Sequence, residues 1–181
     1  MQIVTTDHCT TRHDLIVKLL ASICRLAGAV VFIEPKYSDG KRVDAQVYFA
    51  TDTTALDVRV THPASPSYCI ATKIALTPLG AARDSERKKH TKYDSQAKGE
   101  GASFNPFVLE SFGGFGREAT LFLHKIARSF CENSPFPVNK DAFLKRTIRQ
   151  IGVLLQRGNA YVQLAGCIAA RDAAGRKVGY Y

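Results

Sequence analysis

The sequence predicts an α/β fold in which helices pack against a mixed central sheet. Apolar residues recur at helical spacing over residues 11–28, and three short runs rich in β-branched and aromatic residues follow. A fourth strand-like run lies between two later helical segments. Strands that alternate with helices in this order are typical of a sheet covered by helices.

An amphipathic helix is predicted over residues 11–28, because apolar side chains share one face and a glycine follows them. These residues are Leu15, Leu19, Ile23, Leu26 and Gly28. Residues 29–34 read as a short apolar strand that Pro35 closes. Asp39 and Gly40 then mark a turn.

Residues 43–62 predict a β-hairpin, with a polar connector between two strand-like runs. Asp44 opens the first run, and Asp57 lies inside the second. Because side chains alternate along a strand, Asp57, Arg59 and Thr61 should share one face of the sheet. A carboxylate inside an apolar strand needs a partner. Two interpretations stay open: the two carboxylates share a cation, or Asp57 only pairs with Arg59 and Asp44 only begins its strand.

The second half of the chain predicts more helices around one further strand. Residues 62–69 should be irregular, residues 70–97 mostly helical with an interruption near Pro78, and residues 104–111 a strand. Pro106 suits the beginning of that strand or an edge position. The glycines of residues 113–116 predict a turn into a helix over 117–130, and another helix should run from 140 to 156 or beyond Gly158. We expect a core over residues 1–132 and a C-terminal helical extension over 133–181.

One helical stretch, residues 79–97, combines a buried stripe with many charges. Its predicted inner face holds Leu79, Ala82, Glu86, His90, Tyr93 and Ala97. Lys89 lies at the border of this face, Lys92 on its flank, and Lys88 points away. A solvated run of i to i+3 and i to i+4 charge pairs explains Arg87 and Lys88, but it does not explain Glu86.

The composition favours a soluble, intracellular protein with an anionic partner. The 181 residues carry a formal net charge of +9, from 25 Lys and Arg against 16 Asp and Glu. No stretch approaches the roughly 20 apolar residues of a spanning helix, and the first residues lack an apolar signal core. Five cysteines without a CxxC pair argue against a disulfide framework. His8, Cys9 and His13 match no standard zinc spacing.

Several motifs in order resemble the PD-(D/E)xK nuclease superfamily. These are the αβββαβ order, Asp44, a second carboxylate at Asp57, and a lysine-rich helix. More narrowly, VDAQV, LDVRVTHP, ARDSERKKHTKY and FNPFVLESFGGFG resemble the restriction-like endonuclease domain of non-LTR retrotransposon polyproteins. The K-x-x-K-Y motif of that family corresponds to Lys89, Lys92 and Tyr93. LLQRGNA is similar to the ends of such polyproteins.

The resemblance implies a restriction-endonuclease-like fold and metal-dependent nicking of DNA. Mg²⁺, or Mn²⁺ in its place, would be held by Asp44 and Asp57, with Glu34 as a candidate further ligand. Lys89 would be catalytic, with Glu86, Lys92 and Tyr93 as accessory residues. Phosphate contacts would come from Arg59, Arg83, Arg87 and Lys88.

Two positions depart from the family pattern. Val43 stands where the family has proline, which affects the shape of the turn. Arg59 stands where the superfamily has its lysine, and arginine cannot act as a proton acceptor. In the retrotransposon branch a lysine from the following helix takes this role, and Lys89 is the residue placed to do so.

The resemblance further implies a reverse-transcriptase module in a longer parent polyprotein, and a nuclear location. The sequence does not indicate an oligomeric state. Two other classes remain as alternatives. One is a catalytically inactive nucleic-acid-binding module on the same fold, with Asp57 paired to Arg59. The other is a structural protein whose C-terminal helices bind a partner.

Overall fold

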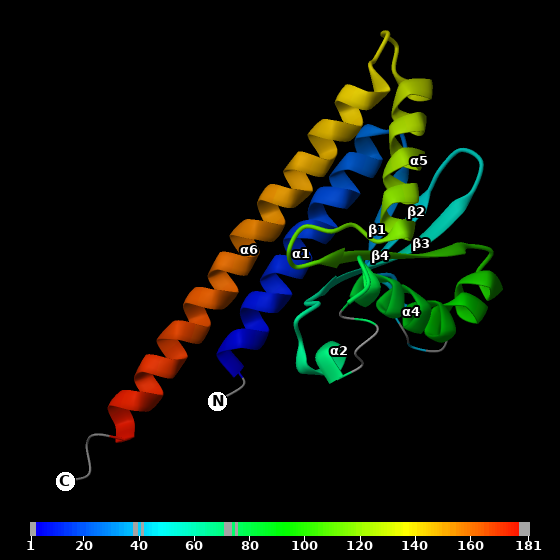
Figure 1. Ribbon diagram of the computed structural model, residues 1–181. Coiled ribbons are helices and arrows are strands. Elements are labelled where there is room, and N and C mark those ends of the chain that lie inside the picture. Colours follow the sequence, from blue (N-terminus) through cyan, green and yellow to red (C-terminus); the bar gives the residue numbers. More distant parts are fainter. Residues whose placement is uncertain (1–2, 38–39, 41, 71–73, 75, 178–181) are drawn as a thin grey trace.

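The protein has an α/β fold built on a four-stranded mixed sheet (Figure 1). A computed structural model describes residues 3–37, 40, 42–70, 74 and 76–177. The strand order is β1-β2-β3-β4, with the first two pairings antiparallel and the last parallel. The elements in chain order are α1 (Ile3–Leu26), β1 (Val30–Ile33), β2 (Ala45–Tyr48), β3 (Thr53–Thr61), α2 (Pro66–Ile70), α4 (Gly80–Gly99), β4 (Ser103–Glu110), α5 (Arg117–Asn133) and α6 (Lys140–Lys177).

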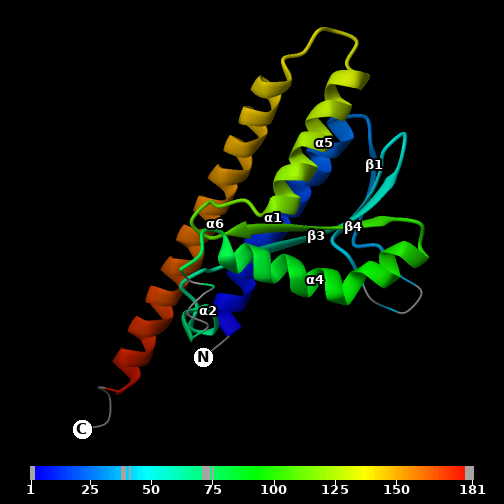
Figure 2. The same ribbon diagram turned by 45° about the vertical axis from the view of Figure 1, so that its right-hand side comes forward.

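Helices cover the two faces of the sheet unequally (Figures 1 and 2). On one face, α1, α5 and α6 form the larger core with Leu56 and Val58 of β3. On the other face, α4 packs with Tyr93 and Ala97 against Ala55 of β3, and Tyr68 of α2 lies beside it. The predicted alternation of β3 is therefore confirmed, because its apolar even-numbered residues and Asp57 belong to opposite faces.

The predicted hairpin and the fourth strand are confirmed. β2 and β3 occupy the centre of the sheet, and Ala45 is the register partner of Leu56. β4 lies at the edge, with Pro106 inside it opposite Asp57. An edge strand tolerates proline because one side of its ladder needs no N–H donor.

Two stretches differ from the prediction. α1 begins at Ile3 rather than near residue 11, since the polar start of the chain also joins the helix. Residues 66–70 form the short helix α2 where irregular chain was expected. Pro66 supplies the fixed φ of a first helical turn, and the carbonyl of Ser65 accepts the N–H groups of Tyr68 and Cys69. Of the predicted helix over 70–97, residues 71–73 and 75 lie outside the described residues.

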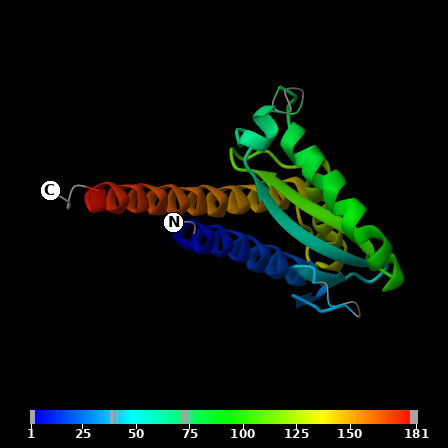
Figure 3. The ribbon, with the colours of Figure 1, turned by 90° about the horizontal axis from the view of Figure 1, so that it is seen from below.

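α6 runs unbroken for 38 residues and belongs to the main core along part of its length. Ile151 and Leu155 are fully buried in the larger core, where α6 packs against α1 and α5. The segment predicted as an extension beyond residue 132 therefore shares the core of the preceding residues. Beyond this contact, α6 projects past the body of the domain beside α1 (Figure 3).

The sequence LLQRGNA on α6 holds three parts of the chain together. A methyl group at Gly158 would overlap the side chain of Arg12, so the glycine lets Arg12 of α1 cross α6. The Arg12 guanidinium donates to Oδ1 of Asn159 at 2.6 Å. Nδ2 of Asn159 donates to the carbonyl of Ser111, also at 2.6 Å, and so ties down the loop after β4.

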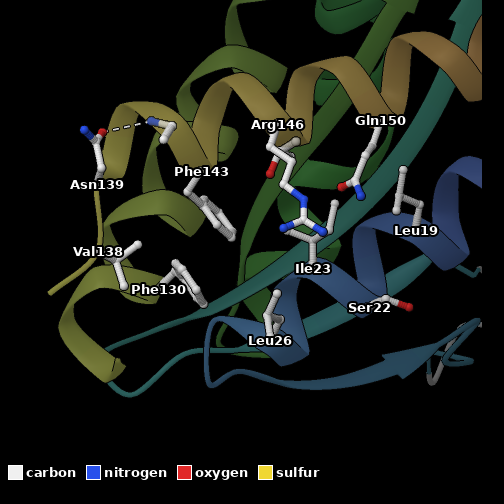
Figure 4. A pocket seen from close by; sticks show the side chains of 12 residues that line it. Leu19, Ser22, Ile23, Leu26, Phe130, Val138, Asn139, Phe143, Arg146 and Gln150 are labelled. Carbon is white, nitrogen blue, oxygen red and sulfur yellow. Dashed lines mark hydrogen bonds between the residues drawn. The ribbon is translucent and has the colours of Figure 1, made fainter. Parts of the chain in front are cut away.

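The junction of α5 and α6 leaves an apolar pocket of about 530 Å³ against α1 (Figure 4). Phe130 and Phe143 stack at one end of it, with ring centroids 4.2 Å apart. Asn139 caps α6 there, because its Oδ1 accepts the N–H of Ala142 at 2.9 Å. Arg146 lies across the pocket toward Ile23 of α1 (Figure 4).

Candidate functional site

Two carboxylates meet where β2 begins beside β3. The register pairs Ala45 with Leu56, so Asp44 precedes β2 directly across from Asp57. Asp57 is 5% exposed on the face that α4 covers, while Asp44 is half-buried. The structure therefore brings together the two acidic residues that the sequence singled out.

Asp44 is held by both β3 and α1. Its Oδ2 accepts the backbone N–H of Val58 at 2.5 Å and lies 3.1 Å from Nε2 of His13. The same nitrogen lies 3.2 Å from the carbonyl of Val58. The hydrogen bond to Asp44 raises the pKa of His13 to about 9, although burial opposes the shift. His13 at neutral pH is therefore an imidazolium that neutralises Asp44.

Sequence reasoning considered His13 only as a zinc ligand and set it aside. Its position on α1 carried a usable signal, because His13 precedes the buried residues Ile16, Val17 and Leu20 by three, four and seven positions. A histidine on the buried face of a helix needs a polar partner. Only the fold reveals that this partner is Asp44, 31 residues away in sequence.

Lys89 of α4 reaches Asp57. Its Nζ lies 2.6 Å from Oδ2 of Asp57, and the two side chains are 18% and 7% exposed. Burial raises the pKa of Asp57, and nearby Asp44 adds to the rise, while the Lys89 ammonium opposes it. Apart from this ammonium, Oδ2 of Asp57 has no hydrogen-bond partner among the described residues.

Of the two interpretations that the sequence left open, the one in which Asp57 pairs with Arg59 is wrong. Arg59 is exposed, and in the described part of the chain it forms no ion pair. The two residues share a face of β3, as predicted, but Lys89 takes the position beside the carboxylate.

A small basic pocket adjoins this pair. It has a volume of about 190 Å³ and is lined by Arg59, Tyr68, Ser85, Lys88, Lys89 and Lys92. No acidic side chain lines it. α2 contributes Tyr68, whose hydroxyl accepts a hydrogen bond from Oγ1 of Thr61 at 3.1 Å. Lys88 and Lys89 are paired with carboxylates, whereas Arg59 and Lys92 have no ion pair among the described residues, so these two cations favour an anion such as a phosphate group in the hollow.

The other cations of α4 differ in their partners. Arg87 and Lys88 both pair with Asp84, at 2.8 Å and 2.6 Å. Together they hold the pKa of Asp84 below its usual value against the opposing effect of burial. Arg83 is exposed. Two of the predicted phosphate contacts are thus already engaged within the helix.

The remaining residues of the K-x-x-K-Y motif have structural contacts. Tyr93 is 6% exposed and packs on Phe104 of β4, with ring centroids 5.3 Å apart. Lys92 is exposed and lies 4.7 Å above the ring of Tyr93. Tyr93 thereby anchors α4 to the sheet and keeps Lys92 at the rim of the basic pocket.

Among the described residues, neither Glu34, the predicted further metal ligand, nor Glu86, a predicted accessory residue, joins the two carboxylates in a metal-binding group. The N–H of Glu34 donates to the backbone carbonyl of Asp44 at 2.9 Å, but its side chain points elsewhere. Glu34 is 63% exposed in its side chain and lies 3.9 Å from Arg42. Glu86 turns toward α5, where its Oε1 accepts the N–H of Glu118 at 3.0 Å. A methyl group at Gly116 would overlap this carboxylate. Glu86 therefore caps the N-terminus of α5, which explains its buried position on α4.

Asp44 and Asp57 are the residues of this site that could bind a metal ion. Within the described ranges, no group of three or more His, Cys, Asp and Glu side chains is placed to hold a metal ion. Mg²⁺ is commonly bound by one or two carboxylates, with waters and substrate phosphates completing its shell. A buried carboxylate oxygen with one ammonium partner, on a strand whose register places a second acidic residue across from it, fits such a hydrated ion. It does not fit a metal that needs a closed protein cage.

Comparisons with known proteins identify no family for this chain. No helix in the described part of the chain is long and apolar enough to cross a membrane. No protein-family model matches the sequence, and no curated protein matches it.

Proposed function

We propose that this protein is a metal-dependent DNA endonuclease with a restriction-endonuclease-like core. The observation that carries the proposal is the position of Lys89, whose Nζ lies 2.6 Å from Asp57 across from Asp44. An acid pair can hold a divalent cation, and a lysine beside it can stabilise the negative charge that develops on a phosphodiester during hydrolysis. The αβββαβ order of the main elements also supports it. The retroelement resemblance makes nicking of a DNA target the expected reaction.

In this proposal Asp44 and Asp57 would hold Mg²⁺ or Mn²⁺ through carboxylate oxygens. A bound divalent cation polarises a phosphate oxygen and lowers the pKa of a coordinated water. His13 and the N–H of Val58 fix the Asp44 carboxylate in position. Lys89 stabilises the negative charge that develops on the phosphate. Arg59 cannot accept a proton and is assigned to the substrate backbone.

The basic pocket would bind a phosphate group of the nucleic acid next to the phosphate that is hydrolysed. Its cations come from β3 and α4, the two elements that also carry Asp57 and Lys89. Phosphate contacts of this kind position the nucleic acid and do not read its sequence. We therefore expect cleavage with little dependence on base sequence.

A second candidate function is a nucleic-acid-binding module without catalysis. The same ion pair favours it, because Lys89 already compensates the charge of Asp57 without any metal. In that case the carboxylate pair and Lys89 stabilise the fold, and only the cations contact nucleic acid.

A plasmid-nicking assay with Mg²⁺, with Mn²⁺ and with EDTA separates the two candidates. The nuclease proposal expects nicking with either metal and none with EDTA. Asp57→Asn should abolish nicking while DNA binding without metal persists, because a metal ligand is lost and a negative charge removed. Asp94→Asn is the matched control, since Asp94 is an exposed carboxylate of α4 that pairs with His90. A folded Asp57→Asn protein that nicks at the wild-type rate would refute the catalytic assignment.

A further inference from the structure

Most of the net positive charge of this protein lies on α6. The helix carries eight Lys and Arg residues against two Asp, a net charge of +6, while the whole chain has +9. α6 belongs to the core on the face of the sheet opposite α4. This charge is therefore remote from the carboxylate pair and the basic pocket.

Four of these cations form a compact surface, which we name the α6 basic face: Lys145, Arg146, Arg149 and Arg157. Lys145 and Arg146 are adjacent, Arg149 follows Arg146 by three residues, and Arg157 follows Arg149 by eight, so the four positions fall within about 120° of the helix circumference. All four are exposed, and among the described residues none takes part in an ion pair. Between residues 140 and 157 the only acidic side chain on α6 is Asp141.

Unpaired arginines on a rigid helix are suited to phosphate oxygens. The guanidinium group offers a planar pair of donors that matches a phosphate, and it is less strongly hydrated than an ammonium. From Lys145 to Arg157 the helix rises about 18 Å, at 1.5 Å per residue. A nucleic-acid strand presents about five phosphates over that length, since each nucleotide advances about 3.4 Å along the axis of a duplex.

We propose that the α6 basic face is a second nucleic-acid contact surface, which binds the phosphate backbone without reading sequence. Charge complementarity favours this partner, because repeated single charges along a strand match a row of separate cations. An anionic membrane is the weaker fit: over residues 145–157 the exposed large apolar side chains are only Ile148 and Val153. A helix that lies in a membrane interface buries a broad apolar face beside its cations.

The proposal goes beyond the nuclease function and does not depend on it. A protein that binds through α6 and cleaves nothing would retain this surface. If both functions exist, the two surfaces lie on opposite faces of the sheet, so one short straight duplex cannot contact both. The protein would then hold two segments of nucleic acid, or one that bends around it.

The test compares two variants of the full chain that lose three positive charges each. Lys145→Gln/Arg149→Gln/Arg157→Gln removes the α6 basic face, whereas Lys18→Gln/Lys98→Gln/Arg128→Gln removes exposed cations from α1, α4 and α5. Fluorescence anisotropy with a labelled 20-nucleotide duplex DNA, single-stranded DNA and RNA gives the affinity at several salt concentrations. Thermal melting shows that both variants are folded.

We expect the α6 variant to bind at least tenfold more weakly at 100 mM salt than wild type. Its slope of log affinity against log salt should fall by about 2–3 on duplex DNA, at roughly 0.9 per lost phosphate contact. The control variant should change the slope by less than about 1. Equal losses in the two variants would overturn the proposal, as would a wild type that binds no nucleic acid at 50 mM salt.

Two further arms keep the result specific. Lys145→Arg/Arg149→Lys/Arg157→Lys retains all three charges and should keep the wild-type slope; loss of binding there would contradict a backbone contact. Vesicles of phosphatidylserine and phosphatidylcholine should bind wild type and the α6 variant alike. Vesicle binding that disappears in the α6 variant, with an unchanged nucleic-acid slope, would assign this face to membranes instead. Nicking on saturating DNA is scored separately, and its absence would refute only the nuclease proposal.

Discussion

α4 and α6 are both basic helices, but they differ in what surrounds their charges. α4 has six Lys and Arg against three acidic residues, and three of its cations are in ion pairs with Asp57 or Asp84. α6 has eight against two, and the four cations of its basic face have no acidic partner in the described residues. Half of the cations of α4 thus pair with carboxylates of the protein itself, whereas the cations of the α6 basic face remain available to another molecule. A count of basic residues does not distinguish these two situations.

The strongest test of this contrast uses adjacent lysines of α4. Lys89→Ala should lower Mg²⁺-dependent nicking about 100-fold or more, because it removes the cation beside the reacting phosphate. Lys88→Ala should lower nicking only a few-fold, since Lys88 pairs with Asp84 and its side chain is 63% exposed. Single-turnover nicking rates give the comparison. Equal losses from the two substitutions would shift the catalytic role toward Lys92.

The same two variants should also differ in stability. Lys89→Ala leaves a buried carboxylate unpaired, a change that costs about 3–5 kcal/mol in fully buried pairs and somewhat less here. Lys88→Ala should stay within about 0.5 kcal/mol, as expected for an exposed residue. Urea unfolding measures both, and Lys89→Ala/Asp57→Asn should regain much of the loss. No recovery in that double variant would mean that Lys89 stabilises the fold through other contacts.

The anchoring of α6 can be tested through its glycines. Gly158→Ala should lower the free energy of unfolding by about 1–3 kcal/mol, because the new methyl group overlaps Arg12. Gly152→Ala is the control on the same helix, since a methyl group there would contact no neighbouring atom. That change should raise the free energy by up to about 1 kcal/mol, from helix propensity alone. Thermal melts of both proteins decide; equal effects would show that Arg12 does not need the space at Gly158.

From the contact of His13 with Asp44 we predict that the free energy of unfolding falls in alkaline solution. Its pKa is about 9 in the folded protein, above the ordinary 6.5, because of the hydrogen bond to Asp44. The stabilisation from its protonated form is complete below pH 6.5 and is lost as the pH rises through 9. We expect this contribution to be on the order of 1–2 kcal/mol after solvent screening. His13→Gln should lack this part of the pH dependence, and His124→Gln, at an exposed histidine of α5, should keep it.

The smallest expected effect comes from freeing the paired cations of α4. Asp84→Asn removes the partner of Arg87 and Lys88 and should strengthen binding to duplex DNA a few-fold. The salt slope should steepen by up to about 2, if both cations then contact phosphates. Asp94→Asn makes the same charge change on the same helix without releasing a Lys or Arg. An identical gain from both would reflect net charge alone, and α4 would not be limited by its ion pairs.

Local periodicity predicted the sheet and part of the inner face of α4: Ala82, Glu86, Tyr93 and Ala97 are buried, but Leu79 precedes the helix and is exposed. The alternation in β3 placed Asp57 on the face opposite Leu56 and Val58, and helical spacing placed Lys89 at the border of the buried stripe and Lys88 in solvent. Both predictions use only the repeat of a strand or a helix. They succeed because the residues involved lie within one element.

Contacts between distant elements were not predictable in this way. The hydrogen bond of Glu86 to Glu118 spans 32 residues and depends on the path of the loop after β4. The contact of His13 with Asp44 requires α1 to pack beneath β2 and β3. The ion pairs of Asp84 with Arg87 and Lys88 are different, because their i to i+3 and i to i+4 spacing is visible in the sequence. That spacing favoured neutralised cations there over phosphate contacts.

The N–H of Val58 provides a built-in spectroscopic reporter. On the β2 side the last register pair joins Ala45 to Leu56, and the next donor of β3 is accepted by the Asp44 carboxylate at 2.5 Å. A short hydrogen bond to a charged acceptor deshields its proton, so the Val58 amide resonance should lie well downfield in a ¹H–¹⁵N spectrum. When a divalent cation or a proton binds to the Asp44 carboxylate, the chemical shift of the Val58 amide should change, while the shifts of neighbouring strand residues change little. The occupancy of the carboxylate pair can therefore be followed by nuclear magnetic resonance at a single backbone position, without any substrate or cleavage.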